Sequence, residues 1–129
     1  MINILICDDD VDITNEVNIL LKNIEAKNRN NFNIDIKNRG DFIFSRNLPY
    51  DIAIVDIEMP GINGLKLSEK LKELNPDIIV IVLTSFQNYL DNAMRIHVFR
   101  YLSKPIDKNR FYENFNDALI EYKYLNKSL

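Results

Sequence analysis

Cysteine, glycine, tryptophan and long apolar runs are scarce or missing in this sequence. Its one cysteine, Cys7, cannot form a disulfide within the chain, which favours a cytoplasmic location. No stretch approaches the roughly 20 apolar residues that a membrane-spanning helix needs. The first residues also lack the charged start and long apolar core of a signal peptide. We therefore expect a cytoplasmic protein without membrane contact, in which Cys7 is a core residue rather than a reactive thiol.

A surplus of positive charge is missing as well. The chain has 16 Lys and Arg residues against 19 Asp and Glu residues, a formal net charge of -3, which argues against nucleic-acid binding by this chain alone. Its 129 residues, 47% of them hydrophobic, are enough for one domain with a real core. No repeat, low-complexity tract or linker interrupts the sequence, so we expect a single domain over residues 1–129.

Strand-like and helix-like patterns alternate along the chain. Short apolar or alternating runs predict five strands, at residues 3–7, 33–37, 52–55, 78–83 and 99–102. Apolar residues at helical spacing predict five helices, at residues 13–24, 41–46, 64–74, 88–97 and 107–125, the first with Asp12 as its N-cap. This alternation indicates an α/β fold, with helices on both faces of a parallel sheet. Five strand–helix repeats suit the flavodoxin-like, doubly wound (βα)5 sheet with strand order 2-1-3-4-5.

Acidic residues follow two of these strands directly. Asp8 and Asp9 follow the first strand, and Asp56 follows the third. In the predicted order these strands are neighbours, so the three carboxylates meet at the edge of the sheet where ligands bind. Because three acids repel one another, the cluster predicts a bound divalent cation, and its oxygen ligands suit Mg²⁺.

The expected metal ligands divide into direct and indirect ones. We expect Asp9 and Asp56 to bind Mg²⁺ directly, together with the backbone carbonyl of Glu58, and Asp8 to hold a metal-bound water. The acids do not follow the spacing of an EF-hand loop.

A carboxylate beside a metal can attack phosphorus and form an aspartyl phosphate. Phosphoryl transfer depends mainly on positioning and on neutralising the phosphoryl oxygens. Lys104 follows the fifth strand and Thr84 follows the fourth, where each can contact a phosphoryl group on Asp56. The one histidine, His97, has no neighbouring Cys or His ligand, and we expect it to be an ordinary, partly exposed residue.

Four motifs in order resemble the response-regulator receiver domain over essentially the whole chain: Asp8-Asp9, Val55 to Gly64 (VDIEMPGING), Leu83-Thr84-Ser85 and Tyr101 to Ile106 (YLSKPI). The resemblance implies a domain that accepts a phosphoryl group from a sensor histidine kinase. It implies six site residues and one backbone feature: Asp56 as phosphoacceptor, Asp8 and Asp9 as the metal pocket, Thr84 and Tyr101 as a switch pair, Lys104 as the phosphate-pairing lysine, and a cis Lys104–Pro105 peptide.

The resemblance also implies how the domain switches. Phosphorylation draws the Thr84 hydroxyl to the phosphoryl group, Tyr101 turns inward, and the surface formed by residues 88–97, 99–102 and 107–125 repacks. The readout is a homodimer or contact with an output domain. Such a domain catalyses its own phosphorylation without being a classical enzyme. We expect slow dephosphorylation, because Phe86 can exclude water while Glu58 adds an acid near the metal.

The first and last motifs resemble the receivers of LytTR-type transcription regulators, in which a DNA-binding domain follows the receiver. None lies within this chain, so DNA contact is expected only through a domain outside it. A stand-alone receiver acting through protein contacts is the alternative. A Mg²⁺-dependent phosphatase with an Asp nucleophile is a further one, although the haloacid-dehalogenase enzymes have Asp where this chain has Glu58. A scaffold that needs no phosphorylation is the third.

Overall fold

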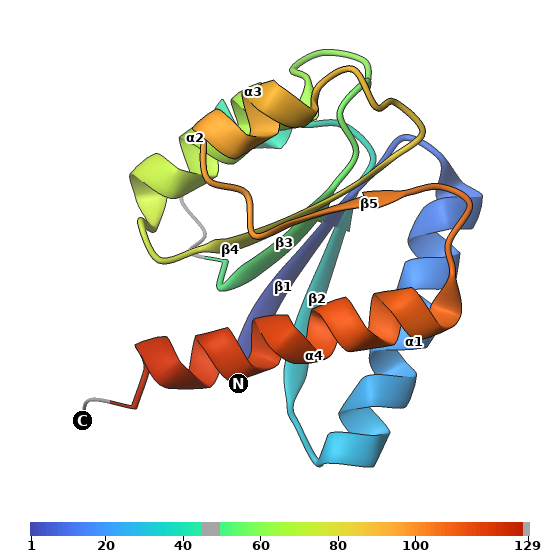
Figure 1. The fold of residues 1–129 in the computed structure, drawn as a ribbon, viewed down its shortest axis with the longest axis vertical. Coiled ribbons are helices and arrows are strands. Elements are labelled where there is room, and N and C mark those ends of the chain that lie inside the picture. The colour runs from blue at the N-terminus through green and yellow to red at the C-terminus, as the bar shows by residue number, and fades with distance from the viewer. Residues whose placement is uncertain (45–49, 128–129) are drawn as a thin grey trace.

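The computed structural model describes residues 1–44 and 50–127, and these form one five-stranded parallel sheet between two layers of helices (Figure 1). The strand order is β2-β1-β3-β4-β5, and every neighbouring pair is parallel, which confirms the predicted flavodoxin-like topology. The strands are β1 (Ile2–Cys7), β2 (Phe32–Lys37), β3 (Ile52–Val55), β4 (Ile79–Thr84) and β5 (Arg100–Ser103). Each differs from its predicted bounds by one residue at most.

Four α-helices cover the sheet, two on each face (Figure 1). They are α1 (Val11–Asn28), α2 (Gly64–Leu74), α3 (Leu90–Arg95) and α4 (Lys108–Leu125). One core cluster lies between the sheet and the pair α1 and α4, and includes Val17, Ile54 and Phe115. A second cluster lies under α2 and α3, and includes Val55, Leu67 and Ala93. All four residues of β3 are buried, as expected for a central parallel strand covered on both sides.

Three helix predictions were wrong in extent. The helix predicted at 13–24 is α1, which begins two residues earlier and ends four residues later. The segment predicted as a helix at 41–46 is a 3₁₀ turn, η1 (Asp41–Phe44), and its last two positions lie outside the described residues. The helix predicted at 88–97 is only six residues long, because Tyr89 is not helical and His97 adopts a left-handed backbone with φ 61°. The Val98 N–H donates to the Ala93 carbonyl and closes this helix end, while the Val98 side chain packs in the core.

The start of α1 also differs from the prediction. Its N-cap is Asp10, whose side chain accepts a hydrogen bond from the Asp12 N–H at 3.0 Å. Asp12 is therefore the second helical residue and not the cap. The helix begins only three residues after β1 ends, so the cap and the acidic pair Asp8-Asp9 belong to one tight connection. No helix among residues 1–44 and 50–127 is long and apolar enough to cross a membrane.

Gly64 brings α2 into direct contact with the end of β3. Its N–H donates to the Ile57 carbonyl at 2.7 Å, and the Asn63 side chain caps the helix by accepting from the Lys66 N–H. A Cβ atom at position 64 would lie 1.8 Å from the backbone oxygen of Asp56. Only glycine therefore lets the helix approach the residue that carries the central carboxylate.

We expect Gly64→Ala to destabilise the protein, because the added methyl group forces apart two backbone segments that cannot rotate away. Overpacking of this kind costs about 1–3 kcal/mol. Urea denaturation measures the loss. Gly40→Ala is the comparison variant, since its nearest obstacle, 2.2 Å from the added Cβ, is a side-chain methyl group of Ile62 and not backbone. Equal losses in the two variants would contradict the proposed backbone contact at Asp56.

Candidate functional site

Three carboxylates meet at the carboxyl end of the sheet. Asp8, Asp9 and Asp56 each place one oxygen within 4.8 Å of the others, as the strand order predicted. Pairing of Cys7 with Val55 aligns β1 with β3, and the Asp56 N–H donates to the Cys7 carbonyl at 3.0 Å. Asp8 and Asp56 are buried, whereas Asp9 is exposed. The cluster is therefore open to solvent at Asp9.

Asp8 is held on several sides. Its carboxylate Oδ1 accepts from the Asp10 N–H at 2.9 Å, its backbone N–H donates to the Lys37 carbonyl, and its own carbonyl accepts from Asn38 Nδ2. The β1–α1 and β2–η1 connections thus fix the same residue. The sequence analysis did not identify Asn38, because its contact is to backbone and carries no chemical motif.

Lys104 connects the two buried acids. Its Nζ lies 2.8 Å from Asp8 Oδ2 and 3.0 Å from Asp56 Oδ2. Its backbone N–H donates to the Thr84 carbonyl at 2.9 Å, which fixes the lysine to the end of β4. The Lys104–Pro105 peptide is cis, as the resemblance implied. One ammonium therefore faces three carboxylates, and the cluster keeps a surplus of negative charge.

Burial and charge shift the pKa values of these groups. Burial raises the pKa of the Asp8 carboxyl, and the nearby Asp56 raises it further, against the lowering effect of Lys104. Burial alone would lower the pKa of Lys104, but its bonds to Asp8 and Asp56 outweigh that effect and raise it. The ammonium is thus the fixed charge of the site, whereas ionised Asp8 carries a cost in free energy.

Cys7 lies behind the acids and takes no part in the site. Burial, followed by the charges of Asp8 and Asp56, raises the pKa of its thiol to about 12. Its Sγ lies 3.8 Å from Met59 Sδ inside the second core cluster. A protonated, buried thiol fits the predicted core role. His97 also lies apart from the acids, just before the start of β5, at the opposite end of the strands.

Thr84 and Tyr101, the predicted switch pair, both contact the backbone of Phe86. Thr84 is fully buried, and its Oγ1 accepts from the Phe86 N–H at 3.3 Å. The partly buried Tyr101 donates its hydroxyl to the Phe86 carbonyl. The β4–α3 connection therefore joins the two residues through the backbone of Phe86. This linking role of Phe86 could not be predicted from the sequence.

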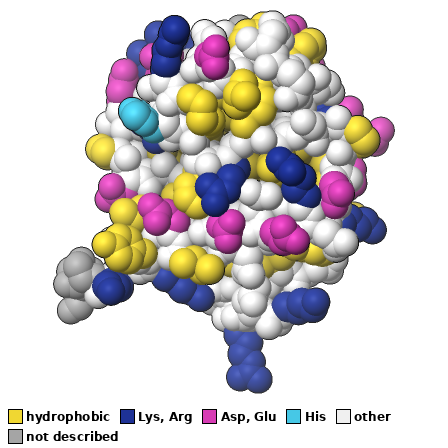
Figure 2. Space-filling model, viewed as in Figure 1, with side chains coloured by type: hydrophobic (Ala, Val, Ile, Leu, Met, Phe, Trp, Pro, Cys, Tyr) yellow, Lys and Arg dark blue, Asp and Glu magenta, His cyan; other side chains and the backbone are white. Residues whose placement is uncertain are grey.

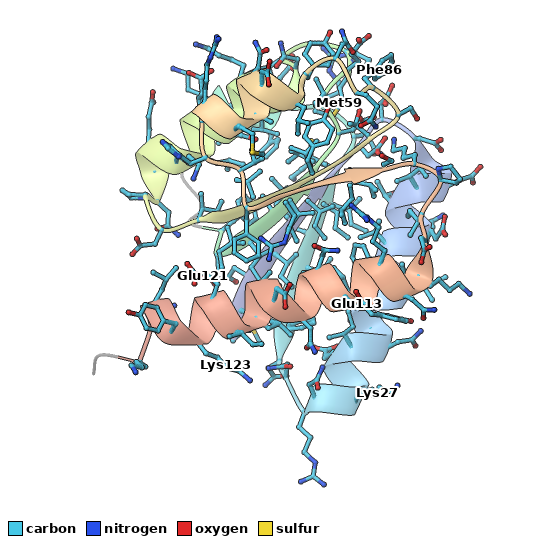
Figure 3. The ribbon with its side chains drawn as sticks, viewed as in Figure 1. Lys27, Met59, Phe86, Glu113, Glu121 and Lys123 are labelled. Atoms are coloured by element: carbon cyan, nitrogen blue, oxygen red, sulfur yellow. The ribbon has the colours of Figure 1, made fainter. Side chains whose placement is uncertain are left out.

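Glu58 and Tyr89 form a second link at the rim of the site. The Tyr89 hydroxyl donates to Glu58 Oε2 at 2.9 Å, which joins the β3–α2 connection to the first residue before α3. The Tyr89 ring meets the Phe86 ring edge to face, with ring centroids 6.4 Å apart, within the range of about 4.5–7 Å for such pairs. Figure 3 shows Met59 and Phe86 on neighbouring connections at this end of the molecule. No local sequence signal pairs two residues 31 positions apart.

The donor set fits Mg²⁺. Carboxylate oxygens are the hard ligands that this ion prefers, and three of them converge here. Within residues 1–44 and 50–127, the Asp9 carboxylate accepts no hydrogen bond and forms no ion pair. It is therefore available to a metal. Both oxygens of Asp8 are already engaged, by Asp10 and Lys104. A metal role for the Glu58 carbonyl stays a prediction.

Comparison with known proteins supports the same interpretation. Residues 4–116 match the response regulator receiver domain. The sensory transduction protein LytT of Bacillus subtilis is 25% identical over 129 residues, which cover 100% of this chain and 51% of LytT. The transcriptional regulatory protein ZraR of Salmonella typhimurium is 27% identical over 122 residues, which cover 92% of this chain and 26% of ZraR. The chain thus spans about half of LytT and a smaller part of ZraR.

Solved structures share the fold. A CheY-like receiver domain protein from Methanospirillum hungatei has a TM-score of 0.82 at 22% identity, over 98% of this chain and 99% of that one. A receiver domain protein from Clostridium thermocellum has a TM-score of 0.77 at 26% identity, over 97% and 99% of the two chains. That one domain takes up all of residues 1–129 stays a prediction, since the family match ends at residue 116. With the acids and Lys104 at the strand ends and this match over most of its length, the chain belongs to the response regulator receiver domain family.

Proposed function

We propose that this receiver accepts a phosphoryl group on Asp56 from a sensor histidine kinase, in a reaction that needs Mg²⁺. The observation that carries the proposal is the double contact of Lys104 Nζ with Asp8 and Asp56 inside a cluster of three acids. A structural role alone does not need a surplus of buried negative charge beside a lysine, because such a cluster costs stability.

Each residue of the site has its own role in phosphoryl transfer. An oxygen of Asp56 forms the new bond to phosphorus while the phosphorus–nitrogen bond of the phosphohistidine breaks and its electron pair stays on the imidazole. Asp9, Asp56 and the Glu58 carbonyl would hold Mg²⁺, with Asp8 acting through a water, and the ion would supply positive charge to neutralise the phosphoryl oxygens. Lys104 offers its ammonium to one phosphoryl oxygen, and the Thr84 hydroxyl offers a hydrogen bond to another.

We infer that the switch works through the backbone of Phe86. In the unphosphorylated chain the Thr84 hydroxyl accepts the Phe86 N–H, and Tyr101 donates to the Phe86 carbonyl. A phosphoryl group adds about -1.5 to -2 charges at Asp56 and attracts the Thr84 hydroxyl. That movement shifts Phe86, and Tyr101 follows because its hydroxyl is bonded there.

The surface that changes is formed by α3, β5 and α4. Figure 2 shows this face: hydrophobic side chains gather over α3, and acidic and basic side chains are mixed over β5 and α4. Leu90 and Met94 of α3 are 44% and 46% exposed. An apolar patch rimmed by mixed charges suits a homodimer contact or an output domain better than nucleic acid.

We propose transcription control as the output, through a DNA-binding domain outside this chain. The support is indirect: ZraR is named a transcriptional regulatory protein, and the chain spans only part of it and of LytT. A cytoplasmic location, where a kinase can donate phosphoryl groups from ATP, is part of the same proposal.

Incubation with acetyl phosphate and Mg²⁺ should add one phosphoryl group, visible by mass spectrometry. Asp56→Asn should abolish the adduct, and removal of Mg²⁺ with EDTA should reduce its formation at least about tenfold, since the metal supplies several kcal/mol of charge stabilisation. Asp35→Asn, a carboxylate on β2 outside the cluster, is the control. Release of many phosphates per chain would support the phosphatase alternative instead, and no adduct would support a scaffold.

Asp8→Asn should raise the free energy of unfolding near pH 7, because burial and the charge of Asp56 make an ionised carboxylate at this position costly. Asparagine keeps an oxygen for the Asp10 N–H. The folded pKa of Asp8 is raised, so its ionisation weakens the fold as pH rises through that pKa, and the advantage of the variant should vanish below the unfolded value of about 3.9.

Urea denaturation without metal at the two pH values measures this difference, with the exposed Asp12→Asn as control. Added Mg²⁺ should stabilise the unaltered chain more than the Asp8→Asn variant, because the ion relieves the repulsion that the substitution has already reduced. A variant less stable than the parent near neutral pH would contradict the charge argument.

Phosphorylation should slow amide exchange in α3 and β5 or change the oligomeric state. A population shift of roughly 1 kcal/mol would slow the exchange by about threefold or more. Thr84→Val should leave the adduct on Asp56 but abolish the surface change, since it removes the hydroxyl that responds to the phosphoryl group. Hydrogen exchange by mass spectrometry and light scattering report the two effects. If phosphorylation changed amide exchange and oligomeric state equally in Thr84→Val and in the unaltered chain, the switch mechanism would be contradicted.

A further inference from the structure

The hydrogen bond between Tyr89 and Glu58 joins the two connections that flank the phosphoacceptor. Glu58 lies in the β3–α2 connection, two residues after Asp56, and Tyr89 lies at the end of the β4–α3 connection, five residues after Thr84. Nothing in the proposed transfer or switch uses this contact. We therefore expect this contact to have an effect that is separate from phosphoryl transfer and from the switch.

The two partners differ in how firmly they are held. Tyr89 packs against the second core cluster, its ring meets Phe86, and its carbonyl accepts the Ala93 N–H of α3. Glu58 is exposed, and only its backbone is fixed, by the buried Ile57 and Met59 on either side. The tyrosine is thus the anchor, and the glutamate side chain is the part that its hydroxyl restrains.

A free carboxylate at this position could assist hydrolysis of an aspartyl phosphate. Water attacks phosphorus, a new oxygen–phosphorus bond forms, and the bond from phosphorus to the Asp56 oxygen breaks with its electron pair returning to the carboxylate. The attacking water must lose a proton, and a nearby carboxylate can accept it as a general base. A hydrogen bond from a phenol occupies one oxygen of that carboxylate and restrains it from reaching the attacking water.

The Tyr89 hydroxyl is a steady donor. An ordinary tyrosine hydroxyl is protonated throughout the neutral range, and this one donates to Glu58 Oε2 at 2.9 Å. Glu58 in turn has no other hydrogen bond from its carboxylate within residues 1–44 and 50–127.

We propose that Tyr89 is a positioning residue that restrains the Glu58 carboxylate and thereby lengthens the lifetime of the phosphoryl group on Asp56. This inference rests on the proposed function, because it needs a phosphoryl group at Asp56. It adds a residue that sets how long a signal lasts, distinct from those that make and sense the phosphoryl group.

The test compares Tyr89→Phe with the unaltered chain. Both are phosphorylated with acetyl phosphate and Mg²⁺, freed of the donor by rapid desalting, and followed by mass spectrometry as the adduct is lost. Phenylalanine keeps the ring against Phe86 and removes only the hydroxyl. Loss should accelerate about two- to tenfold, the population shift that one exposed hydrogen bond supports. Tyr124→Phe on α4, an exposed tyrosine away from the site, should leave the rate unchanged.

A double-mutant cycle with Glu58→Gln separates positioning from a structural effect. If Tyr89 acts through the carboxylate, Tyr89→Phe accelerates loss in the parent but not in the Glu58→Gln background, where no base remains to be released. Equal acceleration in both backgrounds would show that Tyr89 merely supports the β4–α3 connection, and would overturn the inference. So would unchanged or slower loss in Tyr89→Phe.

The two proposals fail in different ways. Absence of an adduct on Asp56 in the unaltered chain removes the proposed function and this inference with it. An adduct that forms normally but has the same lifetime with and without the Tyr89 hydroxyl removes the inference alone. Urea denaturation of each variant accompanies the kinetics, and a variant that unfolds is replaced by Tyr89→Leu, which also lacks the hydroxyl and keeps an apolar side chain.

Discussion

The paired contact of Lys104 with Asp8 and Asp56 is the interaction on which the site depends. Two buried carboxylates beside each other repel strongly, and the ammonium makes their closeness tolerable in the absence of a metal. The same lysine is bonded through its backbone to the end of β4, so the electrostatic balance is tied to the sheet itself. Three strands thus contribute residues to one charge cluster.

The acidic cluster could be predicted from the sequence because it follows from topology. The apolar runs at β1 and β3 are unambiguous, and once the order 2-1-3-4-5 is assumed, Asp8 and Asp56 must end neighbouring strands. The segment at 41–46 could not be assigned as reliably, because a short amphipathic stretch fits a 3₁₀ turn as well as a helix. The end of α3 escaped prediction too, since His97 takes a left-handed conformation that no residue pattern announces.

Contacts between side chains of distant segments lay beyond sequence reasoning. The link from Tyr89 to Glu58 and the bond from Asn38 to the Asp8 carbonyl depend on rotamers and on how closely two connections approach. Neither Asn38 nor Tyr89 lies within the four motifs, and either side chain could have faced solvent without altering the hydrophobic pattern. These are also the contacts by which members of one family can differ while they keep the same acids and the same lysine.

Phe86 joins Thr84 to Tyr101 through its main chain alone: its N–H bonds to one, its carbonyl to the other. The side chain at this position takes no part in that relay. Under the proposed switch, a different side chain at position 86 would change what covers the site but would keep the main-chain bonds to Thr84 and Tyr101. The proposed duration and transmission of the signal would then depend on different parts of the same residue.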